Sequence, residues 1–180
     1  GAIGHVDICY KGRIISFGNY DTNSERLFGA MGDGVLFSAD REKYIEFCKR
    51  ENHKTLLGYG LALSPEQLAA VDKEIAKLMS LTVPWDPPKT VKPKRPGIDK
   101  EEPMYAYKLK QEADGRLYKF TSSKFKTYFV MSTNCVLLAD TIVGAAGTDI
   151  LSVRGFISPG TYQDYLDKEF ERPHSLVVTK

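Results

Sequence analysis

The chain has 180 residues, of which 42% are hydrophobic and 27% are charged, as in an ordinary globular protein with a sizeable core. Its formal net charge of +2 disfavours a dedicated nucleic-acid binder, because such proteins concentrate basic charge on one face or arm. No apolar run approaches the roughly 20 residues that span a bilayer, and no signal peptide is apparent. We therefore expect one domain over residues 1–180, without a transmembrane segment.

Cysteine and histidine residues are few and widely spaced. The three cysteines, Cys9, Cys48 and Cys135, contain no CxxC pair, so a disulfide framework is not expected. The three histidines are scattered, which argues against a zinc site built on close ligand spacing. The sequence predicts neither a metal nor another cofactor.

The first elements are predicted to be strands. Apolar residues alternate in residues 5–10 and 13–17 on either side of Lys11-Gly12, which predicts a tight β-hairpin. Residues 18–34 are rich in glycine, asparagine and aspartate and predict a loop. A strand over residues 34–39 follows.

Two helices are predicted next, separated by a strand over residues 54–63. Asp40 is a favoured N-cap for a helix over residues 41–52. In the helix over residues 64–81, Ser64 is the cap, with Pro65 at the first position and Gln67 completing a capping box. Its expected buried stripe has helical spacing and comprises Leu68, Val71, Ile75, Leu78 and Met79.

Residues from about 83 to 103 contain six prolines and many charges, and predict an extended, solvent-exposed insertion. Its basic part, residues 89–95, is interpreted as a solvated spacer and not as a nucleic-acid patch. Residues 104–111 and 116–120 are predicted to form a second hairpin.

The last elements begin with a strand over residues 127–132 and a helix that starts after Asn134. A helix over residues 158–170, capped by Thr161, and a strand over residues 175–178 complete the chain. Because the paired hairpins imply an antiparallel sheet with helices packed on it, the expected fold class is α+β.

Cys135 is predicted to lie in the first turn of a helix, because Asn134 is a favoured N-cap and an apolar stripe follows it. The unsatisfied N–H groups and the helix dipole at this position favour a thiolate, which is the reactive form of cysteine. The same groups, with Asn134, are candidates to stabilise an oxyanion. The alternative is an inert, buried cysteine.

His5 is the candidate base for this thiol. With Lys11-Gly12 as the turn, Asp7 faces Ser16 across the hairpin, and both lie on the same side as His5. This side is expected to line a cleft, and it also carries Cys9 and Ile14. The opposite side, assigned to the core, comprises Val6, Ile8, Ile15 and Phe17.

The alternative interpretation of His5 is a solvent-facing residue at a strand end. His53 and His174 lie in predicted connections and are interpreted as surface residues.

Residues 4–18, GHVDICYKGRIISFG, and residues 133–143, TNCVLLADTIV, together resemble the circularly permuted branch of the NlpC-type papain-like cysteine hydrolases. In that branch the histidine hairpin precedes the cysteine helix. The matching positions are His5, Val6, Ile8, Asn134, Cys135, Leu138, Ala139 and Asp140. The resemblance implies a permuted papain-like fold in which Cys135 is the nucleophile and His5 is the general base.

The third catalytic position of that family aligns with Ser16, which orients an imidazole only weakly. Asn19 or Asp21, just beyond the strand, are alternatives if the chain bends back, and Asp7 is another on the same side as His5.

The implied activity is hydrolysis of amide bonds through a thioester acyl-enzyme, with a peptide or a peptidoglycan fragment as substrate. A cell-wall enzyme and a delivered antibacterial effector both fit, and an effector implies a cognate inhibitor or immunity protein. The resemblance favours action outside the cytoplasm or at the cell envelope. The alternatives are an acyltransferase or lipid thioesterase on the same fold, and a non-catalytic binding domain.

Overall fold

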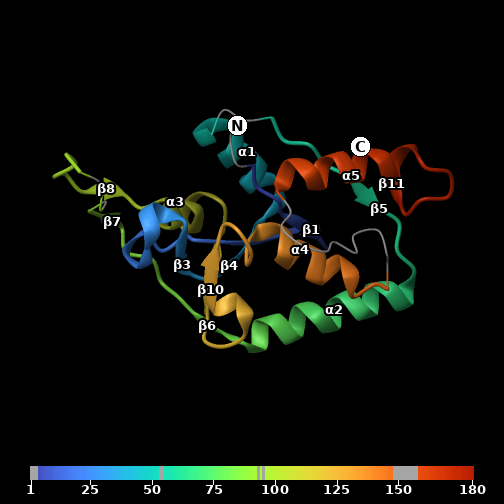
Figure 1. The fold of residues 1–180 in the computed structure, drawn as a ribbon, viewed down its shortest axis with the longest axis horizontal. Helices are drawn as coiled ribbons and strands as arrows, with labels where there is room; N and C mark the ends of the chain where they lie inside the picture. The colour runs from blue at the N-terminus through green and yellow to red at the C-terminus, as the bar shows by residue number, and fades with distance from the viewer. Residues whose placement is uncertain (1–3, 53–54, 93, 95, 148–157) are drawn as a thin grey trace.

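The computed structural model describes residues 4–52, 55–92, 94, 96–147 and 158–180. A five-stranded antiparallel sheet with the order β1-β2-β4-β9-β6 forms its centre (Figure 1). These strands are β1 (Ile8–Tyr10), β2 (Arg13–Gly18), β4 (Val35–Asp40), β9 (Arg116–Phe120) and β6 (Thr82–Pro84). The mixed α/β composition and the antiparallel sheet agree with the predicted class.

Helices cover both faces of the sheet. The five helices of the described residues are α1 (Arg41–Asn52), α2 (Pro65–Ser80), α3 (Tyr105–Glu112), α4 (Cys135–Gly144) and α5 (Pro159–Glu171). One face packs against α1 and α3, and the other packs against α2 and α4 (Figure 1). No helix in the described ranges is long and apolar enough to cross a membrane.

The first hairpin has the predicted register, with Ile8 opposite Ile15 and Cys9 opposite Ile14. Lys11 (φ 48°) and Gly12 (φ 75°) both occupy the left-handed region, as a two-residue type I′ turn requires. The prediction of one apolar and one open side for the hairpin is wrong on β2. Ile14 and Ser16 are buried as fully as Ile15, because α1 and α3 cover the side that was expected to line a cleft.

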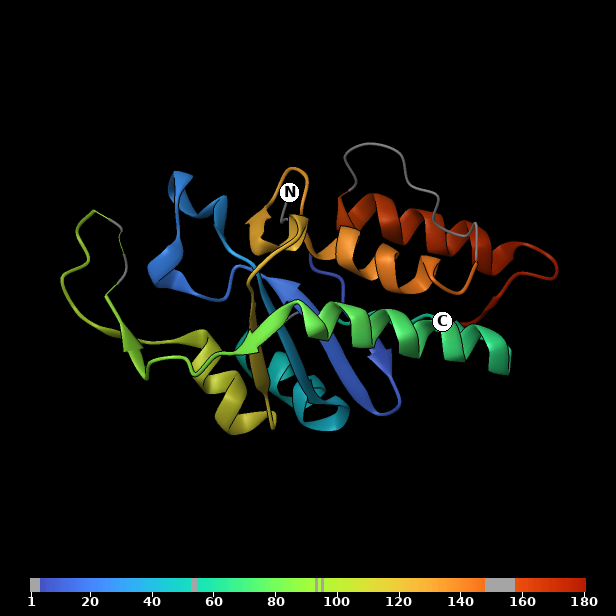
Figure 2. The ribbon, with the colours of Figure 1, turned by 90° about the horizontal axis from the view of Figure 1, so that it is seen from below.

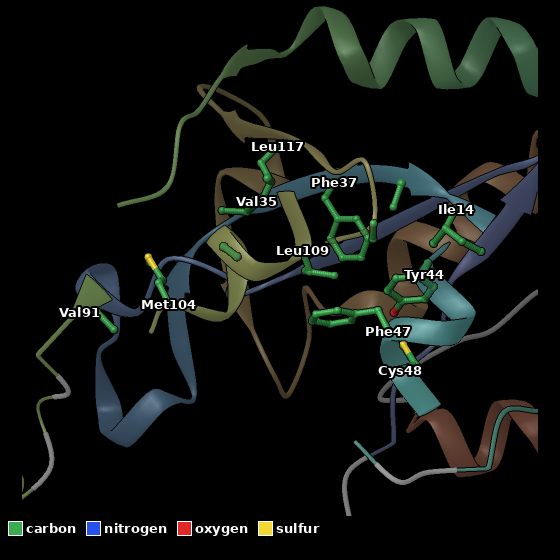
Figure 3. Close-up of a cluster of buried hydrophobic side chains, with 13 residues drawn as sticks. Ile14, Val35, Phe37, Tyr44, Phe47, Cys48, Val91, Met104, Leu109 and Leu117 are labelled. Carbon is green, nitrogen blue, oxygen red and sulfur yellow. The ribbon is translucent and has the colours of Figure 1, made fainter. Parts of the chain in front are cut away.

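The core is divided between the two faces. On the first, aromatic side chains of α1 and β4 pack on α3, and Figure 3 shows Phe37, Tyr44, Phe47 and Leu109 gathered together. On the second, the largest fully buried side chains come from β2 and α4: Phe17, Leu138 and Ile142. The sheet is thus the middle layer of three.

The prediction of a strand over residues 104–111 is wrong, because these residues form α3. The buried Ala106, Leu109 and Ala113 are spaced by three and four residues, which is the helical period. The intervening tyrosines, Tyr105 and Tyr107, obscured this period by suggesting an alternation of two.

The proline-rich segment is not a free spacer along its whole length. It contains a small hairpin of β7 (Thr90–Val91) and β8 (Glu102–Pro103), and Val91 is buried in the first core cluster. This hairpin extends at the end of the molecule opposite to the C-terminal strand β11 (Val177–Thr179) (Figure 1, Figure 2).

Other boundaries differ from the expectations by less. In the predicted strand over residues 54–63, only β5 (Gly60–Leu61) is a strand, paired with β11; residue 54 lies outside the described residues. The predicted loop over residues 18–34 contains two short 3-10 helices, Thr22–Ser24 and Leu27–Gly29, and β3 (Met31–Asp33). β3 pairs with β10 (Thr127–Phe129). Ser158, and not Thr161, caps α5.

The N-terminus of α2 has the predicted capping box. Ser64 Oγ accepts the Gln67 N–H at 3.2 Å, and Gln67 Oε1 accepts the Ser64 N–H at 2.9 Å. Val71 and Leu78 are buried as expected, but Leu68 is 36% exposed.

Ser64→Ala is expected to lower the free energy of unfolding by about 1 kcal/mol, measured by urea denaturation. Ser122→Ala, at an exposed position, is the control, and an equal loss in both variants would contradict the cap's role.

Candidate functional site

The start of α4 positions Cys135. The side chain of Asn134 caps the helix, because its Oδ1 accepts the Leu137 N–H at 3.1 Å and its Nδ2 donates to the Val130 carbonyl at 3.1 Å. Cys135 is therefore the first helical residue, as predicted, beside backbone N–H groups that have no partner within the helix. Cys135 is buried, with only 4% of its surface exposed.

The imidazole of His5 lies among three oxygen atoms. Its Nε2 is 2.7 Å from Ser16 Oγ, 2.7 Å from Asp7 Oδ1 and 3.3 Å from the hydroxyl of Tyr20. The His5 side chain is 38% exposed, so solvent reaches the ring although it hardly reaches the thiol. These contacts fix the orientation of the ring.

Asp7 is the charged member of this group. The Tyr44 hydroxyl, from α1, donates to Asp7 Oδ2 at 2.8 Å. Burial acts to raise the pKa of Asp7, but the charge of His5, followed by the nearby polar groups of His5, Ser16 and Tyr44, lowers it below its ordinary value. Asp7 is therefore a carboxylate at neutral pH.

The surroundings of His5, including Cys135, determine the pKa of its ring. Burial acts to lower the pKa of His5, but the charge and hydrogen bond of Asp7, followed by a hydrogen bond and charge interaction with Cys135, raise it well above its ordinary value. Of the candidates for the third position, Ser16 and Asp7 both lie at Nε2 of His5.

Two tyrosines of the site were not predicted from the sequence. The Tyr20 hydroxyl lies 3.0 Å from Ser16 Oγ, and its ring stacks on that of Tyr105 at 6.3 Å. Tyr44 is a buried residue of α1. The one signal for Tyr44 was a hydroxyl on a side chain that is buried on the same side of the sheet as Asp7.

Asn19 and Asp21, the alternatives for the third position, have other partners. Asn19 Nδ2 donates to the carbonyls of Gly29 and Met31. Asp21 caps the first 3-10 helix and accepts from Lys119 at 2.5 Å. Both therefore hold the loop after β2 in place, and the described contacts do not bring either to His5.

The hydrogen bond from Tyr44 gives a direct test of the Asp7 environment. Tyr44→Phe is expected to raise the pKa of Asp7, followed by carboxyl ¹³C NMR, and to lower the free energy of unfolding by about 1–3 kcal/mol. Tyr162→Phe is the matched control, because the buried Tyr162 hydroxyl has no partner among the described residues. That variant is expected to be neutral or slightly stabilised. Equal effects of the two substitutions would contradict this assignment.

No group of histidine, cysteine or acidic side chains in the described parts of the chain is arranged to hold a metal ion.

Comparisons of the chain with protein-family models, with curated proteins and with solved structures found no match. The resemblance to the permuted NlpC-type hydrolases therefore stays a prediction that rests on the two motifs.

Proposed function

We propose that this protein is a thiol hydrolase of amide bonds, with Cys135 as nucleophile and His5 as general base. The proposal is carried by the placement of Cys135 at the start of α4 and by an imidazole whose Nε2 contacts Ser16 and Asp7 and whose pKa is affected by Cys135. A nucleophile, a base and a group that orients the base are the three parts that covalent catalysis requires.

In the acylation step, the imidazole of His5 takes the proton of the Cys135 thiol, and the sulfur attacks the carbonyl carbon of the substrate. The tetrahedral oxyanion receives hydrogen bonds from the free N–H groups at the start of α4. When the C–N bond breaks, His5 returns the proton to the amine, which leaves. The products are a Cys135 thioester and a free amine.

In the deacylation step, His5 removes a proton from water, and the hydroxide attacks the thioester carbon. The C–S bond breaks, the carboxylic acid leaves, and the proton on His5 returns to the sulfur. Asp7 stabilises the imidazolium that forms in both steps, because its carboxylate is within 2.7 Å of Nε2. The hydroxyl groups of Ser16 and Tyr20 both contact Nε2 and so help to fix the orientation of the ring.

The resemblance of the two motifs favours peptide bonds of peptidoglycan as the substrate. The test is incubation of the purified protein with a muropeptide panel and a peptide panel, followed by mass spectrometry of the products and of the protein. Hydrolysis with a mass adduct on Cys135 is expected. Failure of both panels to give a product or an adduct would overturn the proposed substrate class.

Acyl transfer or thioester cleavage on lipids is the second candidate function. The observation in its favour is that Cys135 belongs to an apolar cluster with Val136, Tyr162 and Val177. An acyl-lipid panel in the same experiment separates the two, since an adduct with the mass of a fatty acyl group replaces one with the mass of a peptide. A protein that forms neither adduct and whose Cys135 is unreactive would be a non-catalytic binding domain.

A further inference from the structure

A hollow of about 210 Å³ lies on the face of the sheet opposite to Ser16. Its floor is aliphatic and is formed by the sheet, α2 and α4: Ile15, Leu36, Ile75, Leu78, Met79 and Ile142. The volume exceeds the roughly 150 Å³ of an apolar cavity that holds benzene in another protein. Ile75 and Met79 remain partly exposed, so a ligand in the hollow would cover apolar surface that now faces water.

The rim of the hollow carries a positive charge. It is formed by Ser38, Tyr118 and the exposed Arg116. Within the described ranges Arg116 makes no ion pair, and the neighbouring Asp114 is bound by Arg13 at 2.8 Å. The guanidinium of Arg116 is therefore available to a ligand.

A second hollow, of about 340 Å³, adjoins the first at Arg116 and Tyr118, which line both. Its Leu117 and Trp85 pack in the core cluster on the opposite face of the sheet. Trp85 and Leu117 supply apolar surface there. The other charged residues that line it, Asp86 and Lys110, form an ion pair with each other. Among the described charged residues that line the two hollows, Arg116 is therefore the one without an ion pair.

We propose that this groove binds an amphipathic anion, with an aliphatic chain in the first hollow and a carboxylate on Arg116. Burial of the chain supplies affinity, and a charge-assisted, two-pronged hydrogen bond from the guanidinium selects the carboxylate. None of Cys135, His5, Asp7 and Ser16 lines either hollow, so the site stands or falls independently of the proposed hydrolase activity.

Trp85 is the single tryptophan of the chain, and its position in the second hollow makes its fluorescence a reporter of binding. The protein is titrated with hexanoate, octanoate and decanoate below their micelle concentrations, and with the alcohols of equal length. Each pair of added methylenes is expected to tighten binding of the carboxylates by about tenfold. The alcohols are expected to bind at least about tenfold more weakly than the carboxylates.

Arg116→Gln is expected to remove the preference for carboxylate over alcohol while leaving the dependence on chain length. Arg26→Gln, at another exposed arginine without an ion pair in the described part of the chain, is the matched control and is expected to bind like the unmodified protein. With the methionine methyl groups labelled, octanoate is expected to shift the NMR signal of Met79 and not that of Met31.

Four results would each overturn the proposal. The first is a titration that shows no saturation with any carboxylate, and the second is equal affinity for carboxylate and alcohol in the unmodified protein. The third is an Arg116→Gln variant that keeps its preference for carboxylate. The fourth is a ligand that shifts the NMR signal of Met31 and not that of Met79.

Discussion

Cys135→Ser is expected to lower kcat for amide hydrolysis by about 10³-fold or more, because a serine hydroxyl next to His5 is a much weaker nucleophile than a thiol activated by the same base. The measurement is the rate of product formation on whichever substrate the panels identify. The side chain is 4% exposed, and serine is close to cysteine in size. Near-identical circular dichroism and thermal unfolding are therefore expected for the variant.

Cys9→Ser is the control for this substitution. Cys9 is an exposed residue of strand β1 and does not lie at a helix start. Its replacement is expected to change the rate of hydrolysis by less than about twofold. If Cys135→Ser kept the rate of hydrolysis, or Cys9→Ser lost it, Cys135 would not be the nucleophile.

Asp7→Asn is expected to reduce kcat by about 10²-fold or more, because an amide in place of the carboxylate no longer stabilises the imidazolium. The pKa of His5 is expected to fall toward its ordinary value, since Asp7 contributes most of the interaction that raises it. NMR titration of the His5 ring measures the pKa, and the pH dependence of kcat/KM measures its consequence. Ser16→Ala is expected to have a smaller effect on both, because Ser16 carries no charge.

The His5–Asp7 pair also predicts how stability depends on pH. The pKa of Asp7 is lowered in the folded protein, so its contribution is present above about pH 4 and is lost as the pH falls through the folded value. The pKa of His5 is raised, so its contribution is complete below about pH 6.5 and is lost as the pH rises through the folded value.

Maximum stability from the pair is therefore expected between about pH 4 and pH 6.5, measured by urea denaturation across pH. In Asp7→Asn the loss on the alkaline side is expected to disappear. An unchanged pH profile of stability and an unchanged His5 pKa in Asp7→Asn would show that the carboxylate does not act on the ring.

Local signals predicted much of the fold. The Lys11-Gly12 turn determines the register of the first hairpin, and Asp40, whose Oδ1 accepts the Lys43 N–H at 3.0 Å, marks the start of α1 as predicted. What the sequence did not indicate was how many layers the fold has. The even-numbered residues of β2, such as Ile14 and Ser16, are buried only because α3 packs with α1 on that face, and α3 itself was predicted as a strand.

The candidate site follows the same division. His5, Asp7 and Ser16 could be placed on one side of the hairpin because strand periodicity holds there. Tyr20 and Tyr44 could not, since their approach to His5 depends on the path of a loop and on the packing of a helix. Asn19 and Asp21 have partners elsewhere, and the sequence did not indicate this because no periodic rule governs the loop after β2.

The rate of alkylation of Cys135 by iodoacetamide at pH 6, with and without His5→Ala, tests the Cys135–His5 pair most directly. Peptide mass spectrometry follows Cys135 and Cys9 in the same sample, so the exposed Cys9 is an internal standard for reagent and folding. Cys135 is expected to react at least about tenfold more slowly in His5→Ala, while Cys9 is expected to react at the same rate in both proteins. Equal rates for Cys135 in the two proteins would contradict the pair.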